Sequence, residues 1–209
     1  MKVLIGTTNP AKVTRFVDFL PDYDIEFLTL KDLGITEEPE EQGNTPEENA
    51  KIKAMFYGRF FDRVICNDSG LYFENLPLDD SRQPGLNIRT PQGKRLDDEE
   101  MITYYGDLIH SLGGKVLAYY LDGIAVYNNG NIETFLDGRG KAAAFYMIDT
   151  PSRNRIPGWP LDSLSINRNT LTYFTDRGNN IYDPVEEQII VGEYRQRVIV
   201  FLKEALGIQ

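Results

Sequence analysis

An acidic loop that leads directly into a capped helix, residues 40–54 (EEQGNTPEENAKIKA), constrains this chain more than any other stretch. Thr45 and Glu48 have the spacing of a capping box, in which the two side chains bond backbone amides at the start of a helix. Pro46 suits the first helical position, where its missing amide hydrogen costs nothing. The pattern predicts a helix from residue 46 to about residue 61, entered from a loop of carboxylates.

Polar side chains share one face of this predicted helix. Asn49 and Lys53 are four residues apart, so they lie on the same side of the helix. Glu41 lies in the loop ahead of them, close to the helix N-terminus. A carboxylate, an amide and an ammonium beside a helix N-terminus form a set that suits a metal-bound polyphosphate.

A second motif begins fourteen residues after Lys53. The short apolar run 63–66 predicts a buried strand, and we expect it to end at Asn67-Asp68-Ser69-Gly70. A carboxylate at the tip of a buried strand is well placed to point into a crevice. The simpler explanation for each motif alone is a solvated acidic loop and an ordinary turn.

The N-terminal residues predict a strand, a polar turn and a helix. Residues 3–5 are a buried strand, and the helix runs to about residue 20. Such a unit directs backbone amides and a helix N-terminus toward whatever lies above the sheet, which favours phosphate. Lys12, in the first turn of this helix, is a candidate phosphate ligand.

Together these motifs resemble the inosine triphosphate pyrophosphatase family, which hydrolyses non-standard purine nucleoside triphosphates. The family has an acid-x-Gly loop, a Glu-Asn-Ala-x-x-Lys-Ala helix and a strand ending in Asp-Ser-Gly-Leu. The counterparts here are 41–43, 48–54 and 68–71. The family's opening Thr-x-Asn-x-x-Lys is matched by Thr7, Asn9 and Lys12.

The resemblance implies a fold, a reaction and a metal. The fold would be α/β, with a long mixed β-sheet flanked by helices, in a single bilobed domain (1–209) with a central nucleotide cleft. The reaction would be Mg²⁺-dependent hydrolysis of a nucleoside triphosphate to a monophosphate and pyrophosphate. Glu41 and Asp68 would hold the metal and form the catalytic pair, with Asp68 orienting the attacking water. The candidate substrate-binding residues are Thr7, Asn9, Lys12, Asn49, Lys53, Ser69, Arg89, Trp159, Asp162 and Arg195.

The resemblance weakens beyond about residue 150, where the family recognises the base. The aromatic expected before Asp162 is Leu161, and the Ser-His-Arg of the last helix appears as 193–195, with Tyr194 at the histidine position. We therefore expect base selectivity to differ from the usual preference for inosine and xanthosine triphosphates. Two alternatives stay open: an enzyme for a pyrimidine or modified nucleotide, and a nucleotide-binding protein that lost turnover because Asn67, Leu161 and Tyr194 replace expected groups.

Composition excludes several other classes of protein. The 209 residues carry a net charge of −10, which argues against a general nucleic-acid surface. No run of eighteen apolar residues predicts a membrane helix, and the N-terminus lacks a signal-peptide pattern. The single cysteine fits a reducing cytoplasm. The lone histidine, His110, argues against a histidine-based triad or metal cluster. We also expect the protein to be a homodimer.

The remaining elements follow from hydrophobic pattern and turn chemistry. The predicted helices are 96–112 and 193–206; the predicted strands are 24–30, 116–127, 132–136 and 141–148; the predicted turns are 128–131 and 137–140.

Overall fold

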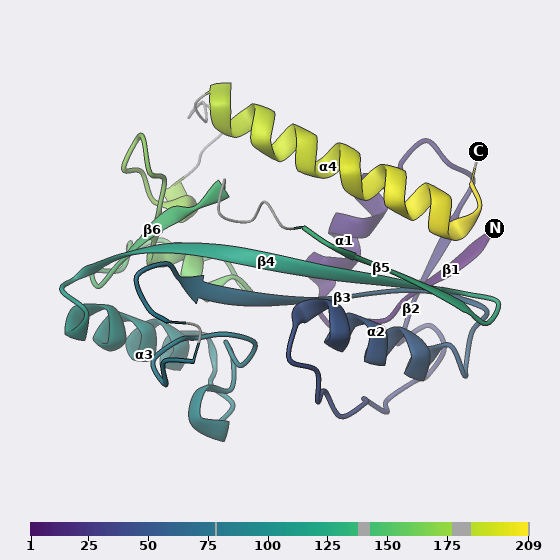
Figure 1. Ribbon diagram of the computed structural model, residues 1–209, viewed down its shortest axis with the longest axis horizontal. Coiled ribbons are helices and arrows are strands. Elements are labelled where there is room, and N and C mark those ends of the chain that lie inside the picture. Colours follow the sequence, from purple (N-terminus) through teal and green to yellow (C-terminus); the bar gives the residue numbers. More distant parts are fainter. Residues whose placement is uncertain (78, 138–142, 177–184, 209) are drawn as a thin grey trace. The chain divides into compact units, whose positions relative to one another are not determined.

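The computed structural model describes residues 1–77, 79–137, 143–176 and 185–208, without the side chains of residues 185–188 and 190. In chain order its helices and strands are β1 (Lys2–Ile5), α1 (Pro10–Phe19), β2 (Glu26–Thr29), α2 (Pro46–Tyr57), β3 (Arg63–Phe73), α3 (Asp98–Ser111), β4 (Lys115–Asn128), β5 (Asn131–Leu136), β6 (Phe145–Ile148), β7 (Ser165–Ile166) and α4 (Val185–Leu206) (Figure 1). Short 3₁₀ turns include η1 (Pro91–Gly93), η3 (Pro160–Ser163) and η4 (Phe174–Asp176).

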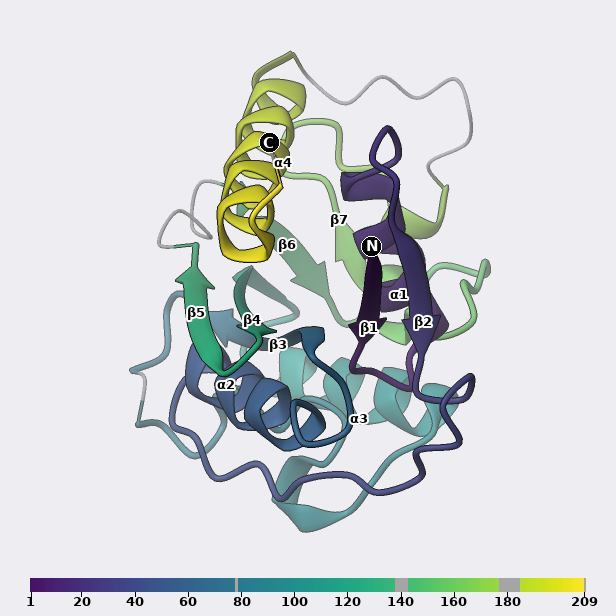
Figure 2. The same ribbon diagram turned by 90° about the vertical axis from the view of Figure 1, so that its right-hand side faces the viewer.

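Seven strands are hydrogen-bonded in the order β2-β1-β3-β4-β6-β7, and β5 pairs with β4. β1 is parallel to both β2 and β3 (Figure 2), whereas β4 is antiparallel to β5 and β6. Parallel and antiparallel pairs in one sheet with flanking helices confirm the predicted α/β class with a long mixed sheet.

The chain divides into two compact units. Unit 1 contains Met1–Ser69, Asp122–Asp137 and Gly192–Gln209, and unit 2 contains Gly70–Leu121 and Gly138–Val191. β3 and β4 each contribute residues to both units, because one boundary falls between Ser69 and Gly70 and another between Leu121 and Asp122. The proposal of one bilobed domain stays a prediction.

Helices lie on both faces of the strands of unit 1. On one face Phe16 of α1 and Val198 of α4 pack with Ile5 of β1. On the other face Ala50 of α2 packs with Leu4 of β1. Successive residues of a strand point to opposite faces, so β1 supplies both cores and is buried on both sides.

The start of α2 differs in one bond from the predicted capping box. Thr45 Oγ1 accepts from the amide of Glu48 at 3.1 Å, as expected. The carboxylate of Glu48, however, accepts from the amide of Asn44 at 2.6 Å, one residue before the cap. The helix then ends at Tyr57, not near residue 61, because Gly58 forms its C-cap.

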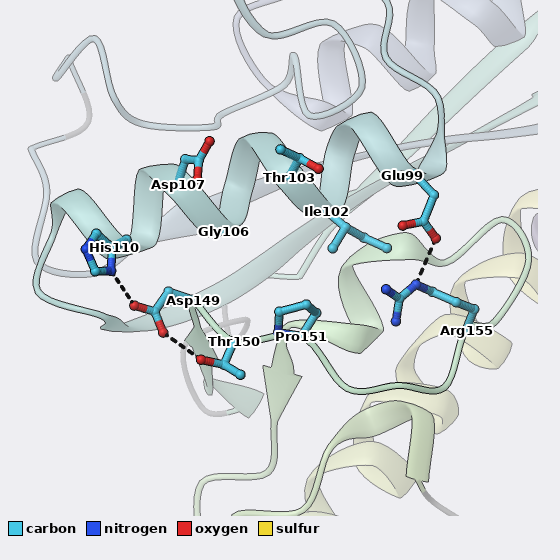
Figure 3. A pocket seen from close by; sticks show the side chains of 10 residues that line it. All are labelled: Glu99, Ile102, Thr103, Gly106, Asp107, His110, Asp149, Thr150, Pro151 and Arg155. Carbon is cyan, nitrogen blue, oxygen red and sulfur yellow. Dashed lines mark hydrogen bonds and ion pairs between the residues drawn. The ribbon is translucent and has the colours of Figure 1, made fainter.

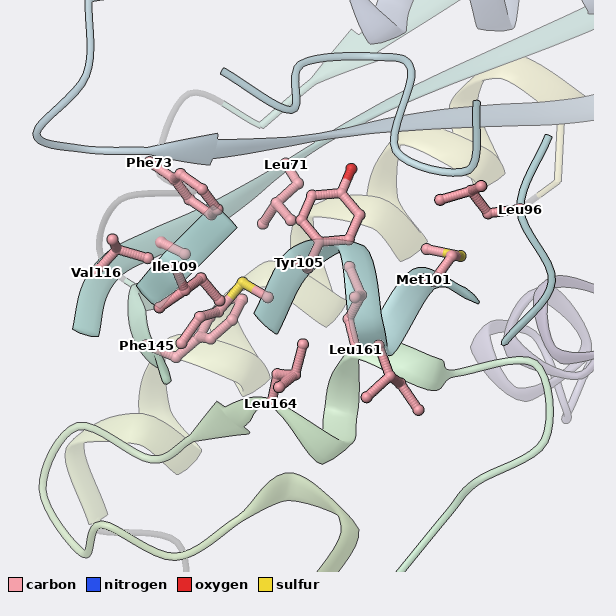
Figure 4. Packing of buried hydrophobic residues seen from close by; sticks show 13 residues of the cluster. Leu71, Phe73, Leu96, Met101, Tyr105, Ile109, Val116, Phe145, Leu161 and Leu164 are labelled. Atoms are coloured by element: carbon pink, nitrogen blue, oxygen red, sulfur yellow. The ribbon is translucent and has the colours of Figure 1, made fainter. Parts of the chain in front are cut away.

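The prediction that the strand ends at Asn67-Asp68 is wrong. β3 continues through this segment to Phe73, so Asp68 lies in the middle of a strand rather than at its tip. The continuation is stabilised by Leu71 and Phe73, which are both buried in the core of unit 2 (Figure 4). The side chains of this run are therefore polar, but the backbone stays in the extended conformation of a strand.

The core of unit 2 forms around α3. Asp97 caps this helix, and Asp97 and Glu100 complete a capping box, so the predicted helix 96–112 is confirmed to within two residues. Tyr105 and Ile109 pack with Met147 of β6 and with Leu161 (Figure 4). Leu161, which stands where the family has an aromatic, is 4% exposed and belongs to this core.

The later elements confirm the hairpin and correct one helix. Asn129 and Gly130 have φ of 49° and 93° between β4 and β5, as the Asn-Gly turn signal predicted. The predicted turn 137–140 and the start of the predicted strand 141–148 lie largely outside the described residues. α4 begins at Val185, eight residues before the predicted 193.

Gly123 sets the approach of α2 to β4. A Cβ built on Gly123 would lie 2.2 Å from the amide nitrogen of Glu47 and 2.3 Å from the carbonyl carbon of Pro46. The first turn of α2 therefore packs directly on the backbone of β4, and the hydroxyl of Thr134 on β5 bonds the carboxylate of Glu47. This contact fixes the helix that carries Asn49 and Lys53.

We expect Gly123→Ala to lower the free energy of unfolding by about 2–3 kcal/mol, because the methyl group meets backbone that cannot yield without moving the helix. Gly192 lies inside α4 and is the control, because a Cβ built there meets nothing within 4 Å. Gly192→Ala should raise stability by about 0.5–1 kcal/mol. Urea unfolding of both variants is the measurement, and equal effects of the two would contradict the contact.

Candidate functional site

A buried amide builds the frame of the site in unit 1. Asn49, in the first turns of α2, is 4% exposed. Its Oδ1 accepts from the amide of Gly43 at 2.8 Å, and its Nδ2 donates to Asp68 Oδ2 at 3.1 Å. One side chain thus joins the acidic loop, the helix and β3. A Cβ on Gly43 would lie 2.6 Å from Asn49 Oδ1, so the loop needs glycine at this point.

Lys53 joins two carboxylates one turn further along α2. Its ammonium lies 3.2 Å from Asp68 Oδ1 and 2.9 Å from Glu41 Oε2. The side chains of Lys53 and Asp68 are only 15% and 13% exposed, and that of Glu41 is 38% exposed. Burial lowers the pKa of Lys53, but attraction to Asp68 and Glu41 outweighs it, so the pKa is raised and the ammonium stays charged.

The structure brings four of the predicted site residues together, and their roles stay predictions. Glu41, Asn49, Lys53 and Asp68 come from three segments and meet at one place. Ser69 follows Asp68 on β3, half-buried. Asp68 uses one oxygen for Asn49 and the other for Lys53, which fixes the plane of its carboxylate.

The N-terminus of α1 holds the second group of candidates. Asn9 caps the helix, with its Oδ1 accepting from the amide of Ala11 at 2.9 Å, and Thr7 Oγ1 accepts from the amide of Asn9 at 3.2 Å. Both side chains therefore shape the turn. Thr7 also lines a cavity of about 700 Å³ whose other walls come from α1 and residues 29–36.

Lys12 lies in the first turn of α1 and is partly buried. Burial, followed by repulsion from Lys53, lowers its pKa, while Asp68 and Asp122 oppose that effect. The two lysines thus influence each other electrically although they belong to different helices. A pair of ammonium groups near Asp68 is an arrangement suited to a polyanion.

The oxygen donors fit a magnesium ion. Glu41 and Asp68 supply carboxylate oxygens that converge on a single cation, the ammonium of Lys53. Magnesium is usually bound through one or two carboxylates together with substrate phosphates and water. Among the described residues no three metal-ligating side chains gather in one place, so the protein part of such a site would be this pair.

Arg195 differs from its predicted role in what it contacts. It is exposed on α4, and its guanidinium donates to the carbonyl oxygen of Asp18 and lies 5.5 Å from the ring centre of Phe19. It therefore binds the C-terminal end of α1. A cation at the end of a helix is favourable there, which gives Arg195 a structural role.

Three candidates, Arg89, Trp159 and Asp162, belong to unit 2. Arg89 forms an ion pair with Asp98 at 2.8 Å. Trp159 is 40% exposed at the start of η3, and Asp162 is half-buried within it. Their contribution to substrate binding stays a prediction.

His110 lies on a surface pocket of unit 2, together with Asp149 and Thr150 (Figure 3). The imidazole Nδ1 is 2.7 Å from Asp149 Oδ2, and the hydroxyl of Thr150 donates to the other carboxylate oxygen at 3.2 Å. The hydroxyl thus bonds the acid and not the imidazole, so these three residues do not form a nucleophile–base pair.

Sequence reasoning missed a polar network in unit 1, formed by Arg15, Asp122 and Tyr194. Arg15 Nη2 donates to Asp122 Oδ2 at 2.7 Å and to the hydroxyl of Tyr194, which itself donates to Asp122 at 3.2 Å. Two signals were available: Arg15 follows Lys12 by three residues on one helix face, and Asp122 is an isolated acid within a run of strand-forming residues.

Cys66 lies below the site, with its thiol 3.6 Å from the carbonyl oxygen of Gly6. Burial raises the pKa of this thiol to about 12. The raised value favours the folded state below the pKa of an unfolded thiol, about 8.5, and that advantage is lost as pH rises from there toward 12.

We expect the folded protein to leave Cys66 unmodified by a thiol reagent at pH 8, because a neutral buried thiol is a poor nucleophile. The same protein in denaturant should react with one equivalent. Absorbance of the released chromophore of a disulfide reagent measures both, and rapid reaction of the folded protein would show that the thiol is accessible.

Comparison with known proteins shows the family to which the chain is similar. Residues 3–142 match the Ham1 family. The chain is 37% identical over 141 residues to a dITP/XTP pyrophosphatase of Thermoanaerobacter pseudethanolicus, covering 66% of this chain and 69% of the relative. A dITP/XTP pyrophosphatase of Bacillus subtilis is 36% identical over 102 residues, covering 48% of this chain and 50% of the relative.

Solved structures show the same fold across nearly the whole chain. A HAM1 protein from Coxiella burnetii superposes with a TM-score of 0.71 at 20% identity, covering 98% of this chain and 100% of that one. The Ham1 protein of Staphylococcus aureus gives a TM-score of 0.67 at 19% identity, covering 95% and 100%. Sequence match, fold and the resemblance of the motifs agree, and the chain belongs to the Ham1 family.

Proposed function

We propose that this protein is a Mg²⁺-dependent nucleoside triphosphate pyrophosphatase that cleaves between the α- and β-phosphates, releasing a nucleoside monophosphate and pyrophosphate. The observation that carries the proposal is the position of Lys53 between Glu41 and Asp68, with Asn49 fixing the second oxygen of Asp68. Membership of a family whose relatives are named dITP/XTP pyrophosphatases supports the enzyme class.

Phosphoryl transfer depends mostly on positioning and on neutralisation of charge. Glu41 and Asp68 would hold the magnesium ion, which when bound supplies positive charge to the phosphate oxygens. Lys12 and Lys53 supply further positive charge from two helices. The four side chains therefore provide both the oxygen donors and the cations that a triphosphate requires.

Asp68 is the residue that we assign to the attacking water. Its carboxylate accepts the water proton as the water oxygen bonds the phosphorus atom and the bond to the leaving phosphate oxygen breaks. Asn49 and Lys53 hold this carboxylate in one plane, at 3.1 Å and 3.2 Å. The base therefore needs no rearrangement before it accepts a proton.

Base selectivity is the part of the function in which this chain should depart from inosine and xanthosine triphosphates. Leu161 is buried in a core, so it is not a surface for a base to stack on. The hydroxyl of Tyr194 is already bound to Asp122 and Arg15. A stacked aromatic contributes ~1–3 kcal/mol per base, and Trp159 is the aromatic of this region that remains exposed.

Two further observations bear on the cellular location of the enzyme. No helix in the described ranges is long and apolar enough to cross a membrane. Cys66 is a free, buried thiol, which fits a reducing compartment. We place the enzyme in the cytoplasm as a homodimer acting on a nucleoside triphosphate, without a nucleic-acid partner.

We expect Asp68→Asn to lower kcat by roughly 10²-fold or more at saturating Mg²⁺, because the amide cannot accept the water proton. Release of pyrophosphate from a deoxyinosine or xanthosine triphosphate is the measurement. Asp32→Asn is the matched control, since Asp32 is an exposed carboxylate of unit 1 that bonds Thr29, at 2.7 Å and 2.8 Å. It should leave the rate near that of the unaltered protein.

Near-native turnover by a normally folded Asp68→Asn protein would remove Asp68 from the mechanism. Release of inorganic phosphate instead of pyrophosphate from every triphosphate would remove the pyrophosphatase proposal itself.

A panel of triphosphates tests base selectivity. We expect kcat/KM for inosine and xanthosine triphosphates to exceed that for adenosine and deoxyuridine triphosphates by less than 100-fold, on the order of 2.7 kcal/mol. The physical reason is that a mismatch of buried donors and acceptors discriminates strongly, and the usual donors are replaced here. A preference of 100-fold or more would show that the familiar selectivity is retained.

A further inference from the structure

Lys12 has an ammonium whose position depends on the helix that carries it. Among the described residues no ion pair or hydrogen bond holds it. Its electrical surroundings combine the repulsion of Lys53 and Arg15 with the attraction of Asp68 and Asp122. Because no such bond holds the ammonium, Lys12 can be directed at a phosphate only if other contacts hold α1 in place.

Arg15 supplies such a contact one turn further along α1. Its guanidinium donates to Asp122 of β4 and to the hydroxyl of Tyr194 on α4. The hydroxyl of Tyr194 donates to the same carboxylate oxygen at 3.2 Å, and the ring centre lies 5.6 Å from the guanidinium carbon. Three elements of unit 1 therefore meet in one closed set of bonds, which we call the Arg15 network.

The Arg15 network is shielded enough to be strong. The side chains of Arg15 and Asp122 are 26% and 19% exposed. Burial raises the pKa of Tyr194, as does the nearby Asp122, so its hydroxyl keeps the proton it donates. A shielded charge-assisted bond is about twice as strong as a neutral one and is directional.

The spacing along α1 connects the network to the phosphate site. Lys12 and Arg15 are three residues apart and share a face of the helix. Fixing the guanidinium against β4 and α4 therefore fixes the rotation of α1 about its axis, and with it the direction of Lys12. It also pairs the guanidinium with Asp122, so that Arg15 does not add an unpaired cation beside Lys12.

On this geometry, and resting on the proposed function, we propose that Asp122 and Tyr194 are positioning residues that hold Arg15 and so keep Lys12 directed at the phosphates of the substrate. They act through Lys12 and touch no reacting atom.

Binding and turnover separate this role from a merely structural one. The probe is an α,β-methylene analogue of deoxyinosine triphosphate with Mg²⁺, whose affinity calorimetry measures without turnover. Tyr194→Phe removes the two hydrogen bonds of the hydroxyl, to Arg15 and Asp122, and keeps the ring, and should weaken binding about fivefold. Asp122→Asn should weaken it about twentyfold or more, because Arg15 loses its counter-charge. KM for the hydrolysable triphosphate should rise more than kcat falls.

The decisive comparison repeats both substitutions in a Lys12→Met protein. If the network acts through Lys12, neither substitution weakens binding further in that background, and the coupling energy equals the single effect. If each substitution weakens binding equally with and without Lys12, the network stabilises the fold in general and the proposal is wrong. Unchanged affinity in the single variants would also overturn it.

Two controls keep the result interpretable. Asp137→Asn breaks a comparable ion pair of unit 1, in which Arg197 Nη2 lies 3.1 Å from the carboxylate at the end of β5. It should leave the affinity unchanged. If Asp122→Asn does not fold, Tyr194→Phe decides the question.

The test of the network does not depend on the reaction. If the protein binds the analogue but releases no pyrophosphate from a triphosphate, the proposed reaction is rejected and the test of the network still holds.

Discussion

The shared ammonium of Lys53 is the interaction on which the candidate site depends. Two carboxylates from separate segments, Glu41 and Asp68, would repel each other without it. The ammonium between them, 2.9 Å from Glu41 and 3.2 Å from Asp68, offsets this repulsion. The Gly43 turn and the cap of α2 help to place α2 so that Lys53 reaches this point.

The position of α2 is in turn set by backbone contact. Gly123 lets the first turn of the helix lie directly on β4, and Asn49 reaches from that turn to both the acidic loop and β3. The helix is therefore held at its N-terminal end, where its dipole is positive. The proposed polyanion site therefore lies at an anchored end of this helix.

Local patterns in the sequence predict those parts of the site that depend on local rules. The helical spacing of Asn49 and Lys53, the cap at Thr45 and the hairpin at Asn129 follow from neighbouring residues, and the structure confirms them. The polar run at Asn67-Asp68 predicts a strand end, because polar residues are typical of turns, but β3 continues to Phe73. Tertiary burial of Leu71 and Phe73 overrides that local preference.

The Arg15 network shows what sequence alone does not reveal. Its partners are separated from Arg15 by 107 and 179 residues, and no periodicity relates them. Leu161 shows the converse, since a motif position matched by alignment is occupied by a core residue. The segment around such a side chain can mark it as unusual, as with Asp122, but it does not reveal the partners that the tertiary fold supplies.

The amide of Asn49 gives the site a direction that no isosteric acid could reproduce. Its oxygen end faces a donor and its nitrogen end faces an acceptor, 2.8 Å and 3.1 Å away. An aspartate of the same shape would present an oxygen to Asp68, so one of the two acids would have to retain a proton. Substitution of Asn49 is therefore more restricted than its size and polarity suggest, because the two bonds depend on which end of the amide carries the oxygen and which carries the nitrogen.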